Sequence, residues 1–361
     1  MKVLLIGGTG TLSMDTTELC ISKGYEVYLF NRGNKNKYVG KNVHYIIGDI
    51  NNAGKAIELI GNLKFDVVVD YLTYNVQTLK KRVTVFEGRT NQYIFISSAT
   101  VFPITKERIS ENSPIGNDGW IYAKEKLQCE RYLKQNIFSF QYTIVRPYVT
   151  YGDKRIPFPI ISKKNSWNLI YRIDNNKPIL MCGDGNQKVT LTNTRDFAIG
   201  ITGLFLNEWA FNEEFNIVGD TEVTWNDVIK KIERTLGKAA SVINVDTKIL
   251  ANKINSISEE LCFDKAHVHI FDNTKIKTVV PEFVTIYDLE KGLDITLNNL
   301  MREKELQIID DDWNAMEDIL CYIYSKKREN VSVSFSKWFK YLKKESKYII
   351  KAKERVKRIM R

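Results

Sequence analysis

The chain has 361 residues and a formal net charge of +10, with 43% hydrophobic and 27% charged residues, which is ordinary for a globular protein of one large domain or two lobes. Five scattered cysteines without a CxxC pair and only three histidines argue against a disulfide framework and a zinc site, so we predict a reduced, cytoplasmic setting and no bound metal. No stretch approaches the roughly 18 apolar residues that a membrane-spanning helix needs.

The N-terminal segment predicts a strand, a glycine-rich turn, a helix and a second strand. Lys2–Ile6 is a short apolar run that ends in the turn Gly7-Gly8-Thr9-Gly10, and a helix-length segment leads from Thr11 to the next apolar run at Tyr25–Phe30. Such a turn suits a nucleotide pyrophosphate, because glycines let the backbone approach the phosphates and the first helical turn directs unpaired N–H groups at the anion. The unit is typical of a dinucleotide-binding fold.

Strands and helices continue to alternate up to residue 152. Apolar runs predict strands at 43–47, 65–70, 92–96 and 140–145, between helices at 51–62, 76–88 and about 119–136. Six strands alternating with helices predict a doubly wound parallel sheet, whose ligands bind beyond the carboxyl ends of the strands. We therefore predict an α/β protein with three parts: a Rossmann domain at 1–152 to which 190–218 return, a smaller mixed α/β substrate lobe at 153–189 and 219–300, and a helical C-terminal extension with a basic tail at 301–361.

Tyr122 and Lys126 lie four residues apart on a predicted helix and therefore on one face of it. The spacing recurs at Tyr287/Lys291 and Tyr322/Lys326, but only Tyr122 follows a Ser-Ser cluster, 24 residues upstream at the end of a predicted strand. A lysine ammonium stabilises a tyrosine phenolate, so Tyr122 is a candidate general base toward a hydroxyl, with Ser98 bonding the same oxygen. The alternative is a buried tyrosine and a solvated lysine on an amphipathic helix.

Taken together, the motifs resemble the extended short-chain dehydrogenase/reductase family, and more narrowly its NAD-dependent nucleoside-diphosphate-sugar epimerases and dehydratases. The resemblance covers roughly residues 1–300 and rests on these segments: Gly7-Gly8-Thr9-Gly10, Gly48-Asp49-Ile50, Ser97-Ser98-Ala99-Thr100-Val101, Tyr122-xxx-Lys126, Arg146-Pro147, Tyr151-Gly152, Gly183-Asp184-Gly185, Phe215-Asn216-Ile217, Thr224-Trp225-Asn226 and Asp272-Asn273-Thr274-Lys275. It implies hydride transfer by a nicotinamide cofactor, with Ser98, Tyr122 and Lys126 as the catalytic group. The cofactor site that it implies consists of Gly7, Thr9, Gly10, Thr11, Leu12, Asn31, Arg32, Asp49, Ile50, Tyr122 and Lys126, with Asp49 at the adenine.

Two departures from the family pattern concern the cofactor. The acidic residue that ends the second strand and holds both ribose hydroxyls of NAD is Asn31 here, and beside it Arg32 offers a guanidinium suited to a 2′-phosphate. We therefore predict NADP, with NAD as the alternative; Arg32 is otherwise a solvated loop residue. Ser13 replaces the third glycine of the turn motif and is expected to crowd the first helix slightly against the strand.

Other departures concern the substrate. The Asp-Glu pair of the family's 4,6-dehydratases is Ala99-Thr100 here, and Thr100 also stands where C3 and C5 epimerases carry a cysteine. Of the activities of this family, a 4-epimerase and a reductase of a keto-sugar nucleotide remain compatible with these residues. We predict Thr100, Arg146 and Lys188 as substrate contacts, although Val149 and Val189 replace an asparagine and an arginine that often hold the sugar diphosphate.

A non-catalytic protein that keeps the cofactor for regulation or structure is the alternative from another class. Some relatives with an Arg-Gly ending to the second strand, as at Arg32-Gly33, are RNA-associated. The complete set of serine, tyrosine and lysine argues against this alternative, because a retired active site has no reason to keep all three.

Most of the net charge lies in the C-terminal tail. Residues 337–361 carry +9, which leaves +1 for the other 336 residues. A helix predicted from Asp311 to Lys327 packs on the body through Trp313, Met316, Ile319 and Ile323. The tail itself predicts a helix with an apolar stripe among basic residues, suited to peripheral contact with an anionic membrane surface. Alternatively the stripe docks on the body or on the second subunit of a homodimer. We do not expect nucleic acid as a partner, since no aromatic-basic platform accompanies the charge.

Overall fold

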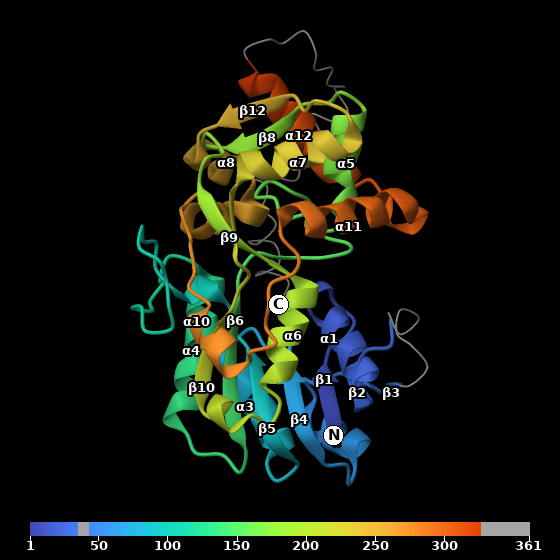
Figure 1. Ribbon diagram of the computed structural model, residues 1–361, viewed down its shortest axis with the longest axis vertical. Coiled ribbons are helices and arrows are strands. Elements are labelled where there is room, and N and C mark those ends of the chain that lie inside the picture. Colours follow the sequence, from blue (N-terminus) through green and yellow to red (C-terminus); the bar gives the residue numbers. More distant parts are fainter. Residues whose placement is uncertain (35–42, 326–361) are drawn as a thin grey trace, which may run out of the picture. The chain divides into compact units, whose positions relative to one another are not determined.

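The computed structural model describes residues 1–34 and 43–325 and divides the chain into two compact units (Figure 1). The first unit comprises residues 1–152, 189–222 and 269–292, and the second comprises 153–188, 223–268 and the part of the chain from 293 onward. Residues 269–292, which the sequence assigns to the substrate lobe, therefore lie in the first unit.

A seven-stranded parallel sheet forms the centre of the first unit, in the order β10-β6-β5-β4-β1-β2-β3 (Figure 1). Its strands are β1 (Lys2–Ile6), β2 (Glu26–Asn31), β3 (Val43–Ile47), β4 (Phe65–Asp70), β5 (Thr90–Ile96), β6 (Gln141–Pro147) and β10 (Glu213–Ile217). The prediction of an α/β Rossmann fold with a doubly wound parallel sheet is confirmed. Because all strands run in one direction, their carboxyl ends lie along one edge, where this fold class binds ligands.

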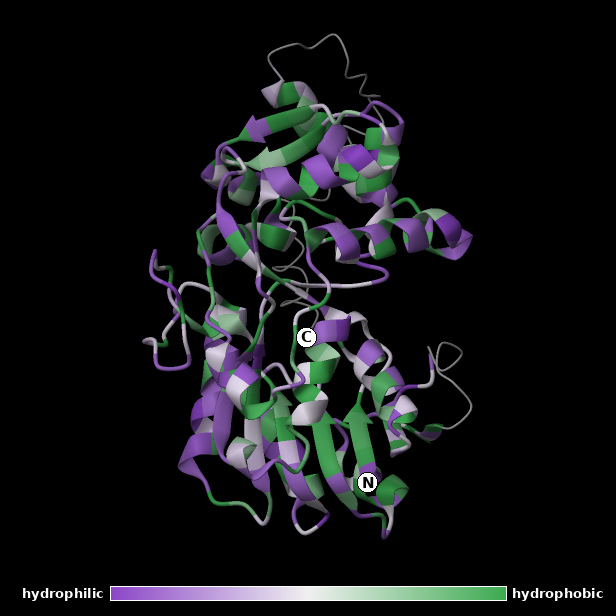
Figure 2. Ribbon diagram, in the orientation of Figure 1, coloured by the Kyte–Doolittle hydropathy of each residue, from purple (hydrophilic) through white to green (hydrophobic). Residues whose placement is uncertain are grey.

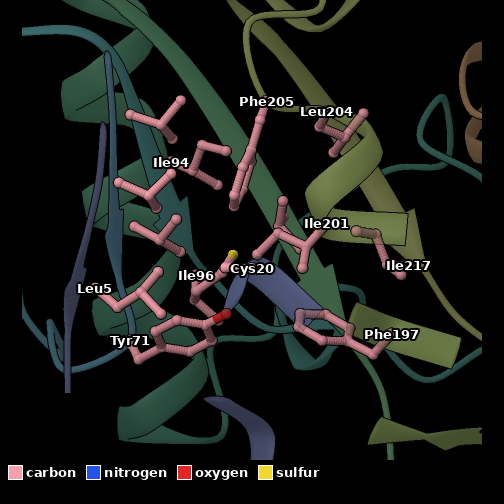
Figure 3. Packing of buried hydrophobic residues seen from close by; sticks show 14 of the residues in the cluster. Leu5, Cys20, Tyr71, Ile94, Ile96, Phe197, Ile201, Leu204, Phe205 and Ile217 are labelled. Carbon is pink, nitrogen blue, oxygen red and sulfur yellow. The ribbon is translucent and has the colours of Figure 1, made fainter. Parts of the chain in front are cut away.

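Helices cover both faces of the sheet, since its strands are apolar on both sides (Figure 2). On β1, Val3 and Leu5 belong to one buried cluster, and the alternate side chains belong to the other. The first face is covered by α1 (Thr11–Ser22), α6 (Thr194–Gly203) and α10 (Thr274–Val279), and the second by α2 (Ala53–Ile60), α3 (Val76–Phe86) and α4 (Ile121–Gln135). Figure 3 shows the first cluster, to which Leu5 of β1, Cys20 of α1 and Phe197 of α6 all belong.

Short elements complete the first unit, and two of them, β9 and β11, extend into segments of the second. A three-stranded sheet has the order β11-β9-β7 and consists of β7 (Thr150–Tyr151), β9 (Lys188–Asn193) and β11 (Thr221–Thr224). Two 3₁₀ helices, η2 (Ala99–Val101) and η3 (Glu208–Ala210), follow β5 and α6. The first of them matters for the site, because it begins directly at Ser98.

The second unit contains a two-stranded parallel sheet of β8 (Ile179–Cys182) and β12 (Val242–Val245). Its helical elements are α5 (Trp167–Asp174), α7 (Trp225–Leu236), α8 (Thr247–Lys253), η4 (Asn255–Ile257), α9 (Ser258–Glu260), η5 (Leu261–Lys265, a π-helix), α11 (Leu289–Arg302, which begins in the first unit), η6 (Lys304–Leu306) and α12 (Asp311–Tyr324). The mixed α/β lobe and the C-terminal helix predicted from the sequence are thus both present.

Helix α12 docks through charges as well as through apolar side chains. Its residues Trp313, Met316 and Ile319 are buried as predicted, whereas Ile323 is 47% exposed, contrary to the prediction. Two acidic side chains, Glu317 and Asp318, point inward instead, and the buried guanidinium of Arg172 lies 3.5 Å and 2.9 Å from their carboxylates. The pairing explains why a helix can bury two carboxylates.

No helix within the described ranges is long and apolar enough to cross a membrane. The basic helix predicted at 337–361 and the end of the predicted helix at Lys327 lie outside the described residues.

Candidate active site

The carboxyl ends of the parallel strands, and the segments that follow them, carry most of the predicted cofactor residues. The glycine turn follows β1, Asn31 and Arg32 end β2, Gly48-Asp49 follows β3, and Ser98 follows β5. Sequence segments up to about ninety positions apart thus reach the same edge of the sheet, as the fold requires.

The glycine turn leaves room beside the backbone where α1 begins. Gly7 and Gly8 have φ angles of +109° and +74°, a conformation that side chains disfavour, and a Cβ at Gly8 would collide with Leu29. Gly10 is the N-cap of α1, and its N–H donates to Ser13 Oγ at 3.0 Å. Ser13, which replaces the third glycine of the motif, therefore accepts a backbone N–H at the start of α1 that a glycine side chain could not accept. Of the next residues, Thr11 is exposed and Leu12 packs partly on the core.

The end of β2 presents an amide and a guanidinium. Asn31 Oδ1 accepts the N–H of Gly33 at 2.7 Å, and Asn31 Nδ2 is buried without a hydrogen-bond partner among the described residues. Arg32 is exposed. After β3, Asp49 is exposed and accepts the N–H of Asn51 at 3.0 Å, whereas the side chain of Ile50 is buried in the core. Ile50 therefore has only its backbone to offer to a ligand.

Lys126 is buried beneath this edge. It is 1% exposed, and its Nζ donates to the carbonyl oxygens of Thr73 at 2.6 Å and Ile96 at 2.7 Å. Burial lowers the pKa of Lys126 to about 8, although the charge of Asp70 opposes this shift. The ammonium thus titrates close to neutral pH, where an exposed lysine would stay charged.

Tyr122 and Lys126 face each other on α4, as predicted. The Lys126 Nζ lies 5.8 Å from the centroid of the Tyr122 ring and 5.0 Å from that of Tyr74. The Tyr122 ring also contacts Tyr74 and Trp120, with centroid distances of 6.3 Å and 5.2 Å. Two aromatic rings therefore fix the orientation of Tyr122. The sequence analysis does not identify Tyr74 or Trp120 as part of the site. The available signal was that Trp120 stands only two positions before Tyr122.

Ser98 and Thr100 form one hydrogen-bonded pair. Thr100 donates to Ser98 Oγ through its hydroxyl at 2.9 Å and through its N–H at 3.3 Å. Both side chains are nearly buried, with 7% and 8% exposure. Because Ser98 accepts from Thr100, its own proton remains for an outside acceptor, and the predicted substrate contact Thr100 acts in this structure on Ser98.

Arg146 is held inside the first unit by a carboxylate. Its guanidinium is fully buried, donates to Glu130 from Nε at 3.0 Å and from Nη2 at 2.7 Å, and lies over the ring of Phe102. Glu130 in turn accepts the hydroxyl of Ser97 at 2.5 Å. Arg146 thus ties α4 to the ends of β5 and β6, while its Nη1 is buried without a hydrogen-bond partner among the described residues. Its contact with substrate stays a prediction. Lys188 is exposed at the start of β9, in the second unit.

Two further features escape sequence analysis. Val149 has a φ angle of +29°, a backbone conformation that β-branched residues rarely adopt. Asp70, at the end of β4, is a fully buried carboxylate in an apolar strand. The sequence signal for this residue was its position directly after Val67-Val68-Val69 in a buried strand. A carboxylate at such a position requires a buried partner. Within residues 1–34 and 43–325, no group of three or more His, Cys, Asp and Glu side chains could hold a metal ion.

The model of the NAD dependent epimerase/dehydratase family matches residues 3–217, which include all of the glycine turn, Ser98, Tyr122 and Lys126. The chain belongs to this family. The extended short-chain dehydrogenase/reductase resemblance is thereby confirmed.

Among curated proteins, this epimerase/dehydratase family member is similar to chloroplast stem-loop binding protein of 41 kDa b from Arabidopsis thaliana, with 23% identity over 86% of this chain and 83% of the relative. It is also similar to the uncharacterized UDP-glucose epimerase YtcB of Bacillus subtilis, with 26% identity over 48% of this chain and 54% of the relative. The two names describe different kinds of function.

Solved structures of sugar-nucleotide enzymes share the fold of this family member. UDP-glucuronic acid 4-epimerase from Bacillus cereus, in complex with UDP-glucuronic acid and NAD, superposes with a TM-score of 0.68 at 19% identity over 84% of this chain and 99% of the other. dTDP-glucose 4,6-dehydratase from Bacillus anthracis, in complex with NAD, gives 0.67 at 18% identity over 84% and 98%. At these identities the likeness shows the fold alone.

Proposed function

We propose that the chain is an NAD(P)-dependent oxidoreductase that transfers hydride at one carbon of a nucleotide-linked sugar, as a 4-epimerase or a keto-sugar reductase. The observation that carries this proposal is the meeting of α4 with the end of β5. Lys126 binds the carbonyl of Ile96, two residues before Ser98, while its Nζ faces the ring of Tyr122. The three groups of the expected chemistry thus lie on α4 and at the start of η2, two elements that contact each other.

In this proposal Tyr122 takes a proton from the sugar hydroxyl during oxidation and returns one during reduction. Lys126 stabilises the phenolate that Tyr122 forms in between, because an ammonium favours a nearby negative charge. Ser98 donates a hydrogen bond to the same sugar oxygen, with its proton freed by the bond it accepts from Thr100. Tyr74 and Trp120 hold the Tyr122 ring in place.

A dinucleotide fits the residues of the first unit. The side-chain-free positions Gly7, Gly8 and Gly10 leave space for a pyrophosphate at the start of α1, and the unpartnered Asn31 Nδ2 is a donor for a ribose oxygen. When bound, the nicotinamide ring accepts or gives the hydride. Arg32 and the missing carboxylate at position 31 support NADP over NAD, and Asp49 would face the adenine.

The substrate class follows from what the site lacks. Ala99 and Thr100 offer no acid–base pair for eliminating water, so the proposal stops at redox chemistry at a single carbon. The residues that we propose near the substrate are Thr100, which donates a hydrogen bond to Ser98, and Lys188. The named substrates of the similar enzymes support a nucleotide-linked sugar.

A second function, RNA association without catalysis, is supported by the similarity over most of the chain to a protein named for stem-loop binding. The complete set of Ser98, Tyr122 and Lys126 favours the enzyme instead. The basic segment 337–361 supports a third contact, with an anionic membrane surface, or alternatively with the second subunit of a homodimer.

The deciding experiment identifies what the chain binds and converts. Protein purified from its own source is denatured, the released nucleotides are identified by mass spectrometry, and the protein is then incubated with UDP- and dTDP-sugars and NAD or NADP. NMR detection of a C4 epimer or a reduced sugar supports the proposal. Tight binding of a stem-loop RNA, together with no turnover of any sugar nucleotide in the presence of either cofactor, would replace it with the second function. Co-sedimentation with anionic vesicles, compared for the full chain and one ending at Val333, tests the tail.

A further inference from the structure

Asp70 is the last residue of β4 and is fully buried, although the three residues before it are valines. Its oxygens accept hydrogen bonds from the N–H groups of Leu72 (2.9 Å) and Thr73 (3.0 Å), the hydroxyls of Thr73 (2.6 Å) and Tyr93 (2.6 Å), and the guanidinium of Arg82 (2.5 Å). Burial opposes the ionisation of Asp70, but Arg82 and the hydroxyl donors outweigh it and hold the pKa of Asp70 below its ordinary value. Asp70 is therefore a buried carboxylate around which residues 71–73 fold.

The loop that Asp70 organises carries one of the two carbonyls that hold Lys126. Thr73 binds Asp70 through its N–H and its hydroxyl, and its carbonyl oxygen accepts the Lys126 Nζ at 2.6 Å. Thr73 therefore links the carboxylate of Asp70 to the ammonium of Lys126 through hydrogen bonds.

Charged and titratable groups face Lys126 from several elements. They are Asp70 of β4, Arg82 of α3, Cys129, Glu130 and Tyr122 of α4 itself, and Tyr74 of the loop after β4. Asp70 exerts the largest of the influences that favour the charged form, while burial favours the neutral form. The carboxylate of Asp70 thus helps this deeply buried lysine to keep its proton, together with the two carbonyl oxygens that accept hydrogen bonds from its Nζ.

Arg82 links the same carboxylate to a second loop. Its Nη2 donates to Asn51 Oδ1 at 3.0 Å, and the N–H of Asn51 donates to Asp49. The loops that follow β3 and β4 are therefore joined through one buried ion pair, Arg82–Asp70.

We propose that Asp70, held by Arg82, is a positioning residue for Lys126. Through Thr73 it fixes the carbonyl that receives the ammonium, and its carboxylate keeps that ammonium charged. The importance of this for catalysis rests on the function proposed above, in which Lys126 stabilises the Tyr122 phenolate. The link from Asp70 to Lys126 does not rest on it, and it is tested without any turnover.

The test measures the protonation of Lys126 itself. Protein labelled with ¹³C at lysine Cε is titrated by NMR, and the Lys126 resonance is assigned from its loss in Lys126→Met. The unmutated protein should titrate near pH 8. In Asp70→Asn, which keeps the shape of the side chain but not its charge, the midpoint should fall by at least about one pH unit. Asp196→Asn serves as the control, because Asp196 is a buried carboxylate of the first unit that caps the N–H groups of Ile286 and Tyr287. It should leave the midpoint unchanged.

A gentler pair of variants decides the matter if Asp70→Asn fails to fold. Thr73→Val loses the hydroxyl that binds Asp70 and should lower the midpoint by a smaller amount, whereas Thr73→Ser keeps the hydroxyl and should match the unmutated protein. Folding of each variant is verified by circular dichroism. A folded Asp70→Asn with an unshifted midpoint, or equal midpoints for the two Thr73 variants, overturns the proposal. Absence of sugar-nucleotide turnover with the midpoints shifted as expected would leave the positioning link standing and reject only the proposed function.

Discussion

The Nζ atom of Lys126 lies 2.7 Å from the carbonyl oxygen of Ile96, the last residue of β5. This contact brings a residue of α4 to the strand end from which Ser98 emerges. It depends on the register in which α4 packs against the sheet, where its residues Cys129 and Leu133 are buried in the core. The geometry of the proposed active site is therefore set by the same packing that holds the fold together.

Replacing Tyr122 by phenylalanine should leave the fold and cofactor binding intact and lower turnover by about 10²–10⁴-fold, the usual loss for a general acid–base group. Turnover of the substrate identified by mass spectrometry is the measurement. Tyr322→Phe is the matched control, since Tyr322 shares the Tyr-xxx-Lys spacing but lies exposed on α12. Near-normal turnover of Tyr122→Phe would remove Tyr122 from the mechanism.

Replacing Arg32 by alanine should weaken NADPH binding by about 1.5–3 kcal/mol and leave NADH binding nearly unchanged, because only NADPH carries the 2′-phosphate. Fluorescence titration with both cofactors measures the difference. Arg89→Ala controls for loss of charge, since Arg89 binds the carbonyl of Gly61 on the amino-terminal side of β5. Equal affinities for NADPH and NADH in the unmutated protein would make Arg32 a solvated loop residue.

Lys126 should make stability depend on alkaline pH. Its pKa is lowered from 10.5 to about 8 by burial, so between these values the unfolded chain binds the proton that the folded chain has lost. The contribution of this group to stability therefore rises with pH, by about 1.4 kcal/mol per unit inside that window. Urea unfolding of the unmutated protein and of Lys126→Met across the window tests this, and only the former should show the rise. Parallel pH profiles would contradict it.

Replacing Val149 by asparagine should stabilise the first unit by about 1 kcal/mol, because a positive φ angle strains a β-branched residue and suits asparagine. Thermal unfolding measures the change. Val149→Ala loses the β-branch but lacks the preference of asparagine for a positive φ angle. Its melting temperature should therefore fall between those of the unmutated protein and Val149→Asn. A melting temperature lowered by Val149→Asn would show that the valine side chain contributes more by packing than its backbone costs.

Replacing Arg172 by methionine should destabilise the second unit by about 3–5 kcal/mol, because Glu317 and Asp318 would lose the cation between them. Chemical unfolding is the measurement. Adding Glu317→Gln and Asp318→Asn to that variant should recover much of the loss, since no uncompensated charge then remains buried. If Arg172→Met is as stable as the unmutated protein, then Lys177, whose Nζ lies 2.9 Å from the Asp318 carboxylate, is enough to neutralise the buried acidic pair.

The sequence predicts the parallel sheet well because each strand is an apolar run bounded by polar or glycine residues. The predicted strands 43–47 and 65–70 coincide with β3 and β4. The spacing also predicts that Tyr122 and Lys126 share one face of α4, and the Ser-Ser cluster upstream distinguishes this pair from the two others with the same spacing. The ends of the predicted helices differ from the observed ones by up to two residues, as local signals there compete with capping contacts.

Partners of buried charges are what the sequence does not reveal. Arg146 precedes a proline at a strand end, a place typical of a ligand contact, yet its partner Glu130 lies 16 residues away on α4. Ile323 continues an apolar pattern on α12 but is exposed, whereas Glu317 and Asp318 interrupt that pattern and are buried beside Arg172. Such choices depend on which residues meet in three dimensions, and a single sequence carries no record of that.

The division of the chain into interleaved segments has a consequence for synthesis on the ribosome. The last strand of the parallel sheet, β10, is made only after the first segment of the second unit, and residues 269–292 of the first unit follow later still. Until then β6 is an open edge, and Ile276, Val280 and Phe283 are missing from the core. The nascent chain therefore presents β6 as an unpaired strand until β10 is made, from residue 147 to residue 213, and keeps part of an apolar face uncovered until residues 276–283 are made. Unpaired strands and uncovered apolar faces are where chaperones bind and aggregation begins.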